Sequence, residues 1–278
     1  MHPRISLSAV STYRWSLDQD LAFYAGAGIP RVGVSIAKLE AAGWEDAVRR
    51  VAAADLEVGN LIGLGPFHLA RPGGWAAQRA RLDRAIDAAA TLGAGCLVLT
   101  TGPAGPLPWE GAADALEAAL APVLARDGAR ELLAIEHTHS LRVDVGFVHT
   151  LRDAVDLARR LGSGVCMEVN ACWAERGLAS TIRAGADVLR LVQVSDFAVG
   201  THATPDRLVP GDGDIPLEAG PGPGARRRVP GLVRPRAHRP PDRGGGLPLG
   251  GPAWHRPAGR APRSPRGVNG RRGALRPT

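Results

Sequence analysis

Three carboxylates and one amide follow short apolar runs between residues 133 and 196 of the 278-residue chain. Glu136 ends the run Leu-Ala-Ile-Glu, Glu168 ends Val-Cys-Met-Glu, and Gln193 and Asp196 lie in Leu-Val-Gln-Val-Ser-Asp. An acid that directly follows a buried strand lies at the strand's mouth, so these side chains are expected to converge on one site. Their oxygens suit a hard divalent cation such as Mg²⁺ or Mn²⁺. Such a cation polarises the carbonyl and hydroxyl oxygens of a sugar while a carboxylate moves a proton.

Two further residues are candidates for contacting a substrate. His68, in Gly-Pro-Phe-His-Leu, follows the third apolar run, and Arg207 opens the loop Arg-Leu-Val-Pro-Gly-Asp-Gly-Asp. Arg207 would hold a hydroxyl, carboxylate or phosphate of the substrate, and the alternative is a solvated loop arginine. For Asp196 the choice is open between substrate contact, support of a metal ligand and capping of a loop. His137 and His139 either orient the preceding glutamate or face solvent.

The elements that must position these residues are short β-rich runs that alternate with longer helical segments. Near-continuous apolar strands separated by helices indicate an α/β protein with a parallel sheet buried on both faces. Seven such units, with no Gly-x-Gly-x-x-Gly after the first strand, favour a (β/α)8 TIM barrel over a dinucleotide-binding sheet. The expected strands are 5–7, 31–35, 58–62, 96–100, 132–136, 165–169 and 188–195, and the expected helices are 16–25, 44–54, 75–92, 112–125, 147–161 and 178–184.

With these residues identified, positions 1–218 resemble the xylose isomerase-like TIM barrels, a superfamily of sugar phosphate isomerases and epimerases that also includes dehydratases and endonuclease IV. The markers are Glu136, Glu168, the run Val-Gln-Val-Ser-Asp around Gln193, and the loop that begins at Arg207. The resemblance implies a divalent metal held at the ends of strands five to eight, with Glu136, Glu168 and Gln193 as the first three ligands. It also implies that Glu136 is catalytic and transfers a proton next to the carbonyl of a sugar or sugar phosphate.

Three positions depart from the pattern of that family. Glu168 stands where aspartate is usual, and its longer side chain still offers carboxylate oxygens. Gln193 stands where histidine is usual, which favours Mg²⁺ or Mn²⁺ over Zn²⁺ because an amide oxygen is a hard ligand. Ala171 stands where a histidine would support a multi-zinc site, so endonuclease activity is disfavoured. A metal-dependent dehydratase of the same superfamily is the alternative to an epimerase.

The composition changes abruptly after Glu218. Residues 219–278 hold 14 arginines, 13 glycines and 12 prolines but a single acid, Asp242, whereas the first 218 residues carry more acids than bases. The net charge of +7 therefore joins a mildly acidic domain to a strongly basic tail. Such a segment cannot bury enough apolar surface to offset its ordering entropy, so we expect a disordered tail. Non-enzymatic nucleic-acid binding through this tail is the alternative function, although the tail has neither repeats nor a folded motif.

The tail has the composition of a GC-rich gene that is read out of frame. The segment 233–238, Val-Arg-Pro-Arg-Ala-His, can be encoded so that a shift of one base gives Phe-Asp-Leu-Glu-Leu-Ile. An apolar strand with a central glutamate suits an eighth barrel strand that carries a fourth metal ligand. We therefore interpret the tail as the product of a single-base insertion near Glu218, real or a sequencing error. The barrel would then be incomplete after strand seven, with open edges and impaired activity.

The cysteines and the N-terminus indicate the cellular setting. Cys96, Cys166 and Cys172 show no Cys-x-x-Cys spacing and no even framework, which fits a reducing cytoplasm. The chain does not begin with a basic stretch followed by an apolar run, and no uncharged stretch reads as a membrane span. We expect a small-molecule sugar or polyol as the partner, with no specific nucleic acid and no membrane.

Overall fold

The structure is a computed structural model that describes residues 4–201 and 206–217. The expected disordered tail at 219–278, and the strand expected to have been displaced there, lie outside the described residues. The description below therefore concerns the barrel part of the chain.

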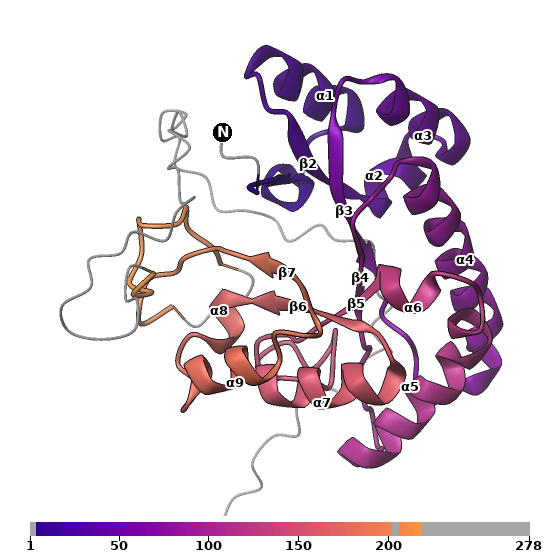
Figure 1. Ribbon diagram of the computed structural model, residues 1–278, viewed down its shortest axis with the longest axis vertical. Coiled ribbons are helices and arrows are strands. Elements are labelled where there is room, and N and C mark those ends of the chain that lie inside the picture. Colours follow the sequence, from indigo (N-terminus) through magenta and orange to yellow (C-terminus); the bar gives the residue numbers. More distant parts are fainter. Residues whose placement is uncertain (1–3, 202–205, 218–278) are drawn as a thin grey trace, which may run out of the picture. The chain divides into compact units, whose positions relative to one another are not determined.

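Seven parallel strands form one sheet whose spatial order follows the sequence (Figure 1). They are β1 Leu7–Ser8, β2 Arg31–Ser35, β3 Glu57–Leu64, β4 Leu97–Thr100, β5 Leu133–Glu136, β6 Gly164–Glu168 and β7 Leu189–Gln193. The sheet curves into an open half-barrel, so the predicted α/β fold with the strands of an incomplete TIM barrel is confirmed. Parallel strands in sequential order bring all their carboxyl ends to one edge, which is where the candidate residues lie.

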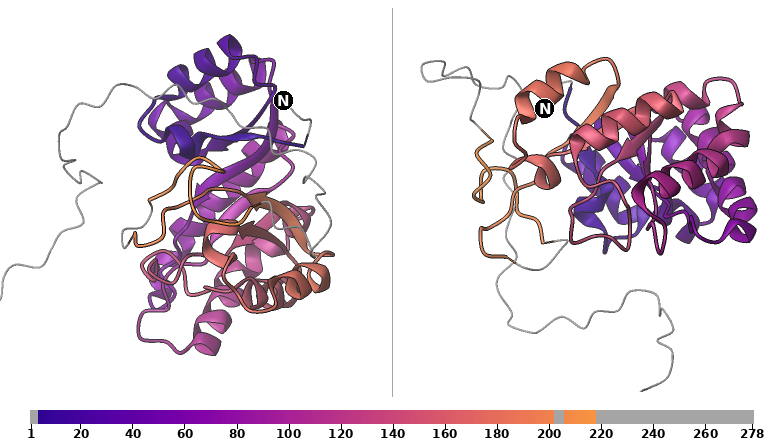
Figure 2. Two further views of the ribbon diagram at one scale, coloured as in Figure 1. Left: turned by 90° about the vertical axis from the view of Figure 1, so that its left-hand side faces the viewer. Right: turned by 90° about the horizontal axis from the view of Figure 1, so that it is seen from below.

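Helices connect consecutive strands and lie along the outer side of the curved sheet (Figures 1 and 2). The α-helices are α1 Leu17–Gly26, α2 Ile36–Ala41, α3 Trp44–Ala53, α4 Trp75–Thr91, α5 Trp109–Leu124, α6 Ala129–Leu132, α7 Leu151–Leu161, α8 Val169–Cys172 and α9 Leu178–Ala184. Two short 3₁₀ helices are η1 Ala9–Thr12 and η2 Pro72–Gly74. No helix within the described residues has the length and apolar character needed to cross a membrane.

All seven predicted strands and all six predicted helices are present in the described residues, but most of their bounds differ from the prediction by one to four residues. β2 and α9 have the predicted bounds, whereas α7 begins at Leu151 instead of position 147. The Thr150 hydroxyl accepts a hydrogen bond from the Asp153 backbone N–H at 3.1 Å, and this cap fixes the start of the helix. The prediction missed α2, α6 and α8, because helices of one or two turns carry too little periodicity to be recognised.

Two apolar clusters lie on opposite faces of the sheet. The larger one fills the space between the outer face of the sheet and the helices. The smaller one lies on the inner face and consists of Ile62, Cys96, Val98, Ala134 and Cys166, with Leu191 packed against it. All three cysteines are buried free thiols. The inner cluster forms the floor beneath the carboxyl ends of β4 to β7.

The outer face of β7 is covered much less than that of the strand beside it. On β6, Val165 and Met167 are 0% and 6% exposed under the helix layer. On β7, Val192 lies opposite Met167 but is 50% exposed, and Val194 just beyond the strand is 37% exposed. β7 pairs only with β6 among the described strands, so it is an edge of the sheet there.

This difference predicts unequal costs for the same substitution on neighbouring strands. Val165→Ala should lower the free energy of unfolding by about 2 kcal/mol, because it removes fully buried methyl groups. Val192→Ala should cost well under about 1 kcal/mol, because half of that side chain is already in contact with water. Urea unfolding of the two variants measures both values. Equal losses would contradict the open outer face of β7.

Candidate functional site

The side chains at the ends of β5, β6 and β7 lie on the inner face of the sheet. Side chains alternate between the two faces along a strand, so a residue two positions beyond an inner residue also points inward. Each candidate lies two residues beyond a member of the inner cluster or its packed neighbour: Glu136 beyond Ala134, Glu168 beyond Cys166, and Gln193 beyond Leu191. Glu168 is directly opposite Gln193 in the β6–β7 pair. The structure thus places the three predicted ligands in one row at the mouth of the half-barrel.

The Glu168 carboxylate is the most strongly held of these groups. It is 2% exposed, and its Oε1 accepts hydrogen bonds from the Asn170 backbone N–H at 3.1 Å and from Ser195 Oγ at 3.3 Å. Its Oε2 accepts from the Arg207 guanidinium at 2.7 Å. A charge-assisted bond of this kind compensates for the cost of removing a carboxylate from water. Arg207, predicted as a substrate contact, is therefore brought directly to the row of carboxylates.

Glu136 lies close enough to Glu168 for the two charges to interact. Burial raises the pKa of Glu136, the nearby Glu168 charge raises it further, and the positive charges of Arg207 and Arg142 only partly offset these effects, so the pKa rises to about 7. A carboxyl group with a pKa near neutrality can both give and take a proton under physiological conditions. This property distinguishes Glu136 from an ordinary acid at the end of a strand.

His137 positions the Glu168 backbone. Its Nε2 accepts a hydrogen bond from the Glu168 N–H at 3.1 Å, and the side chain is fully buried. Burial, aided by the nearby His149, lowers the pKa of His137 to about 4, so the ring is neutral with its hydrogen on Nδ1. His137 was expected to orient Glu136 or face solvent; instead it reaches from the end of β5 to the next strand. His139 is bound locally, since its Nδ1 accepts from the Leu141 N–H at 3.2 Å.

Asp196 holds together the loop that carries Arg207. It is fully buried, and its carboxylate accepts backbone N–H groups from Phe197 at 3.0 Å, Gly211 at 2.9 Å and Ile215 at 2.9 Å. Burial alone would raise the pKa of Asp196, but these backbone donors outweigh it and the pKa is lowered. Of the roles left open by the sequence, this geometry corresponds to capping of a loop. Both oxygens are directed at the protein's own backbone.

A glycine allows the backbone to approach this carboxylate. A Cβ atom placed on Gly213 would lie 2.5 Å from Asp196 Oδ1 and 2.5 Å from the Phe197 carbonyl oxygen, closer than real Cβ contacts. Asp196 also bridges to Leu208 through a pair of antiparallel backbone bonds at 3.0 and 2.7 Å. The loop from 207 to 215 is therefore folded around a single buried charge, and Arg207 extends from its first residue.

His68 is not brought into this network. Its side chain is exposed, in the loop between β3 and η2. The backbone of His68 is held instead: its N–H donates to Gln78 Oε1 at 3.3 Å, and its carbonyl accepts from Trp75 Nε1 at 3.1 Å. The loop lies beyond the carboxyl end of β3, and the His68 residue is exposed there.

The donor set suits a hard divalent cation in chemical type. Glu136, Glu168 and Gln193 offer carboxyl and amide oxygen atoms, and a cation would relieve the repulsion by which the Glu168 charge raises the pKa of Glu136. Within the described residues, no group of three or more His, Cys, Asp or Glu side chains is assembled for a metal ion. The described ends of β5 to β7 thus bring together two carboxyl groups and one amide.

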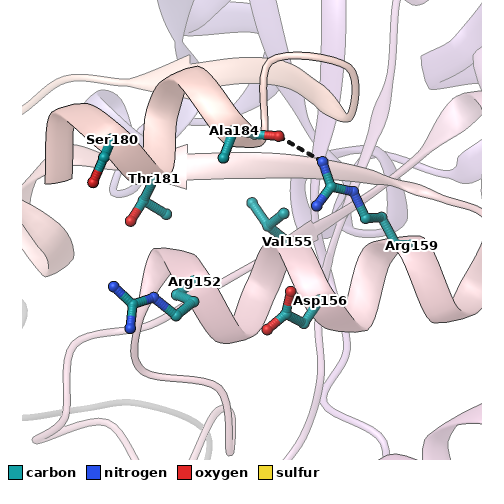
Figure 3. Close-up of a pocket in the computed structure, with 7 residues that line it drawn as sticks. All are labelled: Arg152, Val155, Asp156, Arg159, Ser180, Thr181 and Ala184. Carbon is teal, nitrogen blue, oxygen red and sulfur yellow. Dashed lines mark hydrogen bonds between the residues drawn. The ribbon is translucent and has the colours of Figure 1, made fainter. Parts of the chain in front are cut away.

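A separate pocket lies between α7 and α9, on the outer layer of helices. It is lined by Arg152, Val155, Asp156, Arg159, Ser180, Thr181 and Ala184 (Figure 3). Arg159 is already engaged, donating to the Ala184 carbonyl at 2.5 Å and to Asp187 at 2.7 Å. None of the candidate site residues lines this pocket, so it is distinct from the row at the strand ends.

Comparison with known proteins identifies the family of this fold and site. Residues 24–219 match the family described as xylose isomerase-like TIM barrel, and the chain belongs to that family. No curated protein matches the sequence.

Solved structures show the same fold. Protein SMc04130 from Sinorhizobium meliloti 1021 is 28% identical with a TM-score of 0.66, and the match covers 78% of this chain and 82% of that one. The 3-keto-D-glucoside 4-epimerase YcjR from E. coli is 16% identical with a TM-score of 0.54, covering 69% and 79%. The IolI protein, solved with a zinc atom, is 15% identical with a TM-score of 0.58, covering 77% and 81%.

The raised pKa of Glu136 predicts a specific dependence of stability on pH. The folded state holds this proton up to about pH 7, whereas the unfolded chain releases it near the ordinary value of 4.5. Binding of this proton stabilises the folded state. The stabilisation is complete below the pKa of Glu136 in the unfolded chain, and it is lost as the pH rises through the pKa of Glu136 in the folded chain. Relative to Glu136→Gln, the wild-type chain should therefore lose about 1–3 kcal/mol between pH 5 and pH 8.

Urea unfolding at the two pH values, in the presence of a chelator, measures this loss. Glu110→Gln, at an exposed position on α5, serves as the control and should follow the wild type at both pH values. If Glu136→Gln also follows the wild type, the pKa of Glu136 is not raised.

The Asp196 cradle predicts that two different substitutions release the same loop. Asp196→Asn replaces an acceptor oxygen by an amide that cannot accept a backbone N–H, and Gly213→Ala introduces a Cβ where there is no space. Amide hydrogen exchange at Gly211 and Ile215 should become at least about tenfold faster in both variants. The exposed Asp212→Asn is the control. Unchanged exchange in Asp196→Asn would show that the carboxylate does not hold the loop.

Proposed function

We propose that this chain is a divalent-metal-dependent sugar or sugar phosphate isomerase/epimerase that acts by carboxylate proton transfer next to a carbonyl. The observation that carries the proposal is the neutral-range pKa of Glu136 at the mouth of the half-barrel, beside a second buried carboxylate. Proton abstraction next to a carbonyl is favoured by a base whose pKa lies near the working pH. Family membership supports the same class of chemistry.

In this proposal Glu136, Glu168 and Gln193 hold the metal, and Glu136 is also the catalytic base. An all-oxygen set that includes a neutral amide favours Mg²⁺ or Mn²⁺ over Zn²⁺. The bound metal would supply Lewis acidity that polarises the substrate's carbonyl and hydroxyl oxygens. The protein's own contribution is to place Glu136 against the carbon-bound proton and to hold the Glu168 carboxylate in position through Arg207.

The remaining predicted residues take different roles in substrate handling. Arg207, which is 39% exposed at its side chain, can hold a substrate hydroxyl or phosphate while it contacts Glu168. His68 is the second candidate contact, from the loop after β3. Asp196 acts on the substrate only through Arg207, by holding the loop, and His137 acts only through the backbone of Glu168. We also propose that residues 1–218 form one incomplete barrel domain with weak activity.

Metal binding tests the ligand assignment without a substrate. Titration of the full chain with Mn²⁺, followed by the electron paramagnetic resonance signal of the free ion, should show binding. This binding should be lost in Glu168→Gln and weakened in Gln193→Ala. The control is Glu57→Gln. Glu57 is an exposed acid at the start of β3, so it lies at the amino-terminal edge of the sheet, away from the candidate site at the carboxyl ends of the strands. If Glu168→Gln binds Mn²⁺ as tightly as the wild type, the metal site is not at the ends of these strands.

Proton transfer is tested by solvent exchange. Ketoses and ketose phosphates incubated with the chain and Mn²⁺ in D₂O should lose the proton next to the carbonyl, which ¹H NMR follows directly. Glu136→Gln should slow this exchange by roughly 10²–10⁴-fold, the typical contribution of a general base. An epimer as product supports the isomerase/epimerase assignment, and loss of water identifies a dehydratase instead. Exchange that is unaffected by Glu136→Gln would refute the role of this residue.

A further inference from the structure

A second arginine lies beside the candidate site, on a loop that the sequence did not single out. Arg142 belongs to the loop between β5 and α7, which leaves the sheet at Glu136. Its positive charge lowers the pKa of Glu136, so the guanidinium lies within electrostatic reach of that carboxyl group. Arg207 acts on Glu136 in the same way from the loop after β7. Two guanidinium groups on separate loops therefore approach the same carboxyl group.

The Arg142 side chain is turned toward the protein, although it lies in the exposed part of its loop. Its neighbours Leu141 and Val143 are 57% and 62% exposed, whereas the side chain of Arg142 is 30% exposed. Asp144 accepts two hydrogen bonds from Arg142, one from Nε at 2.9 Å and one from Nη2 at 3.1 Å. This bidentate contact fixes the plane of the guanidinium group.

The loop that carries Arg142 is held by backbone hydrogen bonds. The Thr138 N–H donates to the Val148 carbonyl at 2.9 Å, which joins the two arms of the loop. The Gly102 N–H, beyond β4, donates to the Val145 carbonyl at 2.9 Å, which joins the loop to the neighbouring strand end. A cation that is held in place before binding loses little conformational freedom when a ligand arrives.

Each of the two arginines has hydrogen-bond donors left after its contact with a carboxylate. Within the described residues, Arg142 Nη1 and Arg207 Nη2 make no hydrogen bond. The two side chains are 30% and 39% exposed, so solvent reaches both of them. A phosphate or carboxylate group offers several charged oxygen acceptors to such donors, whereas a sugar hydroxyl offers one uncharged oxygen. The pair therefore favours an anionic group over a neutral one.

We infer that Arg142 binds an anionic substituent of the substrate, a phosphate or a carboxylate, with Arg207 as the second cation of the site. Arg142 is then the residue that selects anionic sugars over neutral ones. Asp144 and Glu168 each hold one guanidinium group in place, and the substituent takes the remaining donors. This inference rests on the proposed function, because the substituent belongs to the molecule whose proton Glu136 transfers.

The competing role for Arg142 is to fasten its own loop through Asp144. Two variants separate these roles. Arg142→Gln removes the positive charge, whereas Asp144→Asn weakens the ion pair and leaves the guanidinium in the chain. A residue that only fastens the loop would give the same result in both variants. A residue that binds an anion would give a loss in Arg142→Gln alone.

Binding of inorganic phosphate to the full chain tests the anion site without a substrate. At pH 6 Glu136 holds its proton, so its charge does not oppose the anion. ³¹P NMR titration should show that Arg142→Gln weakens phosphate binding by roughly tenfold or more, the contribution of one charge-assisted hydrogen bond. Asp144→Asn should bind phosphate at least as tightly as the wild type, and Arg142→Lys should fall between the two. No binding to the wild type, or equal losses in Arg142→Gln and Asp144→Asn, would overturn the inference.

Selection among substrates is tested with three ketoses of the same length. They are fructose, its terminal phosphate ester, and the keto acid that carries a carboxylate at that terminus. In the solvent-exchange assay with Mn²⁺, Arg142→Gln should raise KM for the charged substrates by about tenfold or more and leave KM for fructose unchanged. The charged compound with the lower KM in the wild type identifies phosphate or carboxylate as the natural substituent. An equal change of KM for all three compounds, or no change, would overturn the selective role of Arg142.

Failure of this inference is distinguishable from failure of the proposed function. Absence of exchange in all three compounds would contradict the proposed function, while phosphate binding would still decide whether Arg142 forms an anion site. Exchange of fructose alone, with phosphate binding unaffected by Arg142→Gln, would leave the proposed function standing and overturn the anionic substrate.

Discussion

The placement of two carboxylates at the buried ends of neighbouring strands is the constraint on which the site depends. Burial and the Glu168 charge raise the pKa of Glu136, and the Arg207 and Arg142 charges lower it. The Arg207 guanidinium donates a hydrogen bond to Glu168 at 2.7 Å. Glu136 has no such partner within the described residues, and its pKa is raised to about 7. One carboxylate is thereby bound by a guanidinium, and the other has a pKa at which it can exchange a proton. This division of roles follows from their unequal neighbours rather than from their type.

The surrounding residues maintain this division by fixing backbone. The Asp196 carboxylate accepts hydrogen bonds from backbone N–H groups of the loop that begins at Arg207. Gly213 has no Cβ atom, so the backbone of the loop can lie close to this carboxylate. His137 holds the N–H of Glu168 from the neighbouring strand. Asp196 and His137 both act on the site through backbone contacts. A change at either would alter where Arg207 or Glu168 lies, and through them the proton affinity of Glu136.

The fold and the row of candidate residues could be predicted because each depends on local sequence. An apolar run that ends in a polar residue indicates both a strand and the side chain at its carboxyl end. Glu136, Glu168 and Gln193 were therefore found together with the strands that carry them. The partners of these residues could not be predicted, because they depend on distances between strands and loops. That Arg207 contacts Glu168, that His137 reaches β6, and that Asp196 faces backbone are properties of the assembled half-barrel.

The incomplete sheet affects the three candidate ligands unequally. Glu136 and Glu168 lie on β5 and β6, each paired on both sides within the described sheet, so their positions do not depend on what lies beyond β7. Gln193 lies on the edge strand, where one row of backbone groups is unpaired. Edge strands open at lower free energy than interior ones, so Gln193 is the ligand whose position depends most on a neighbouring strand. Closing the β7 edge should therefore fix the position of Gln193, the proposed neutral ligand, while the two carboxylates stay where they are.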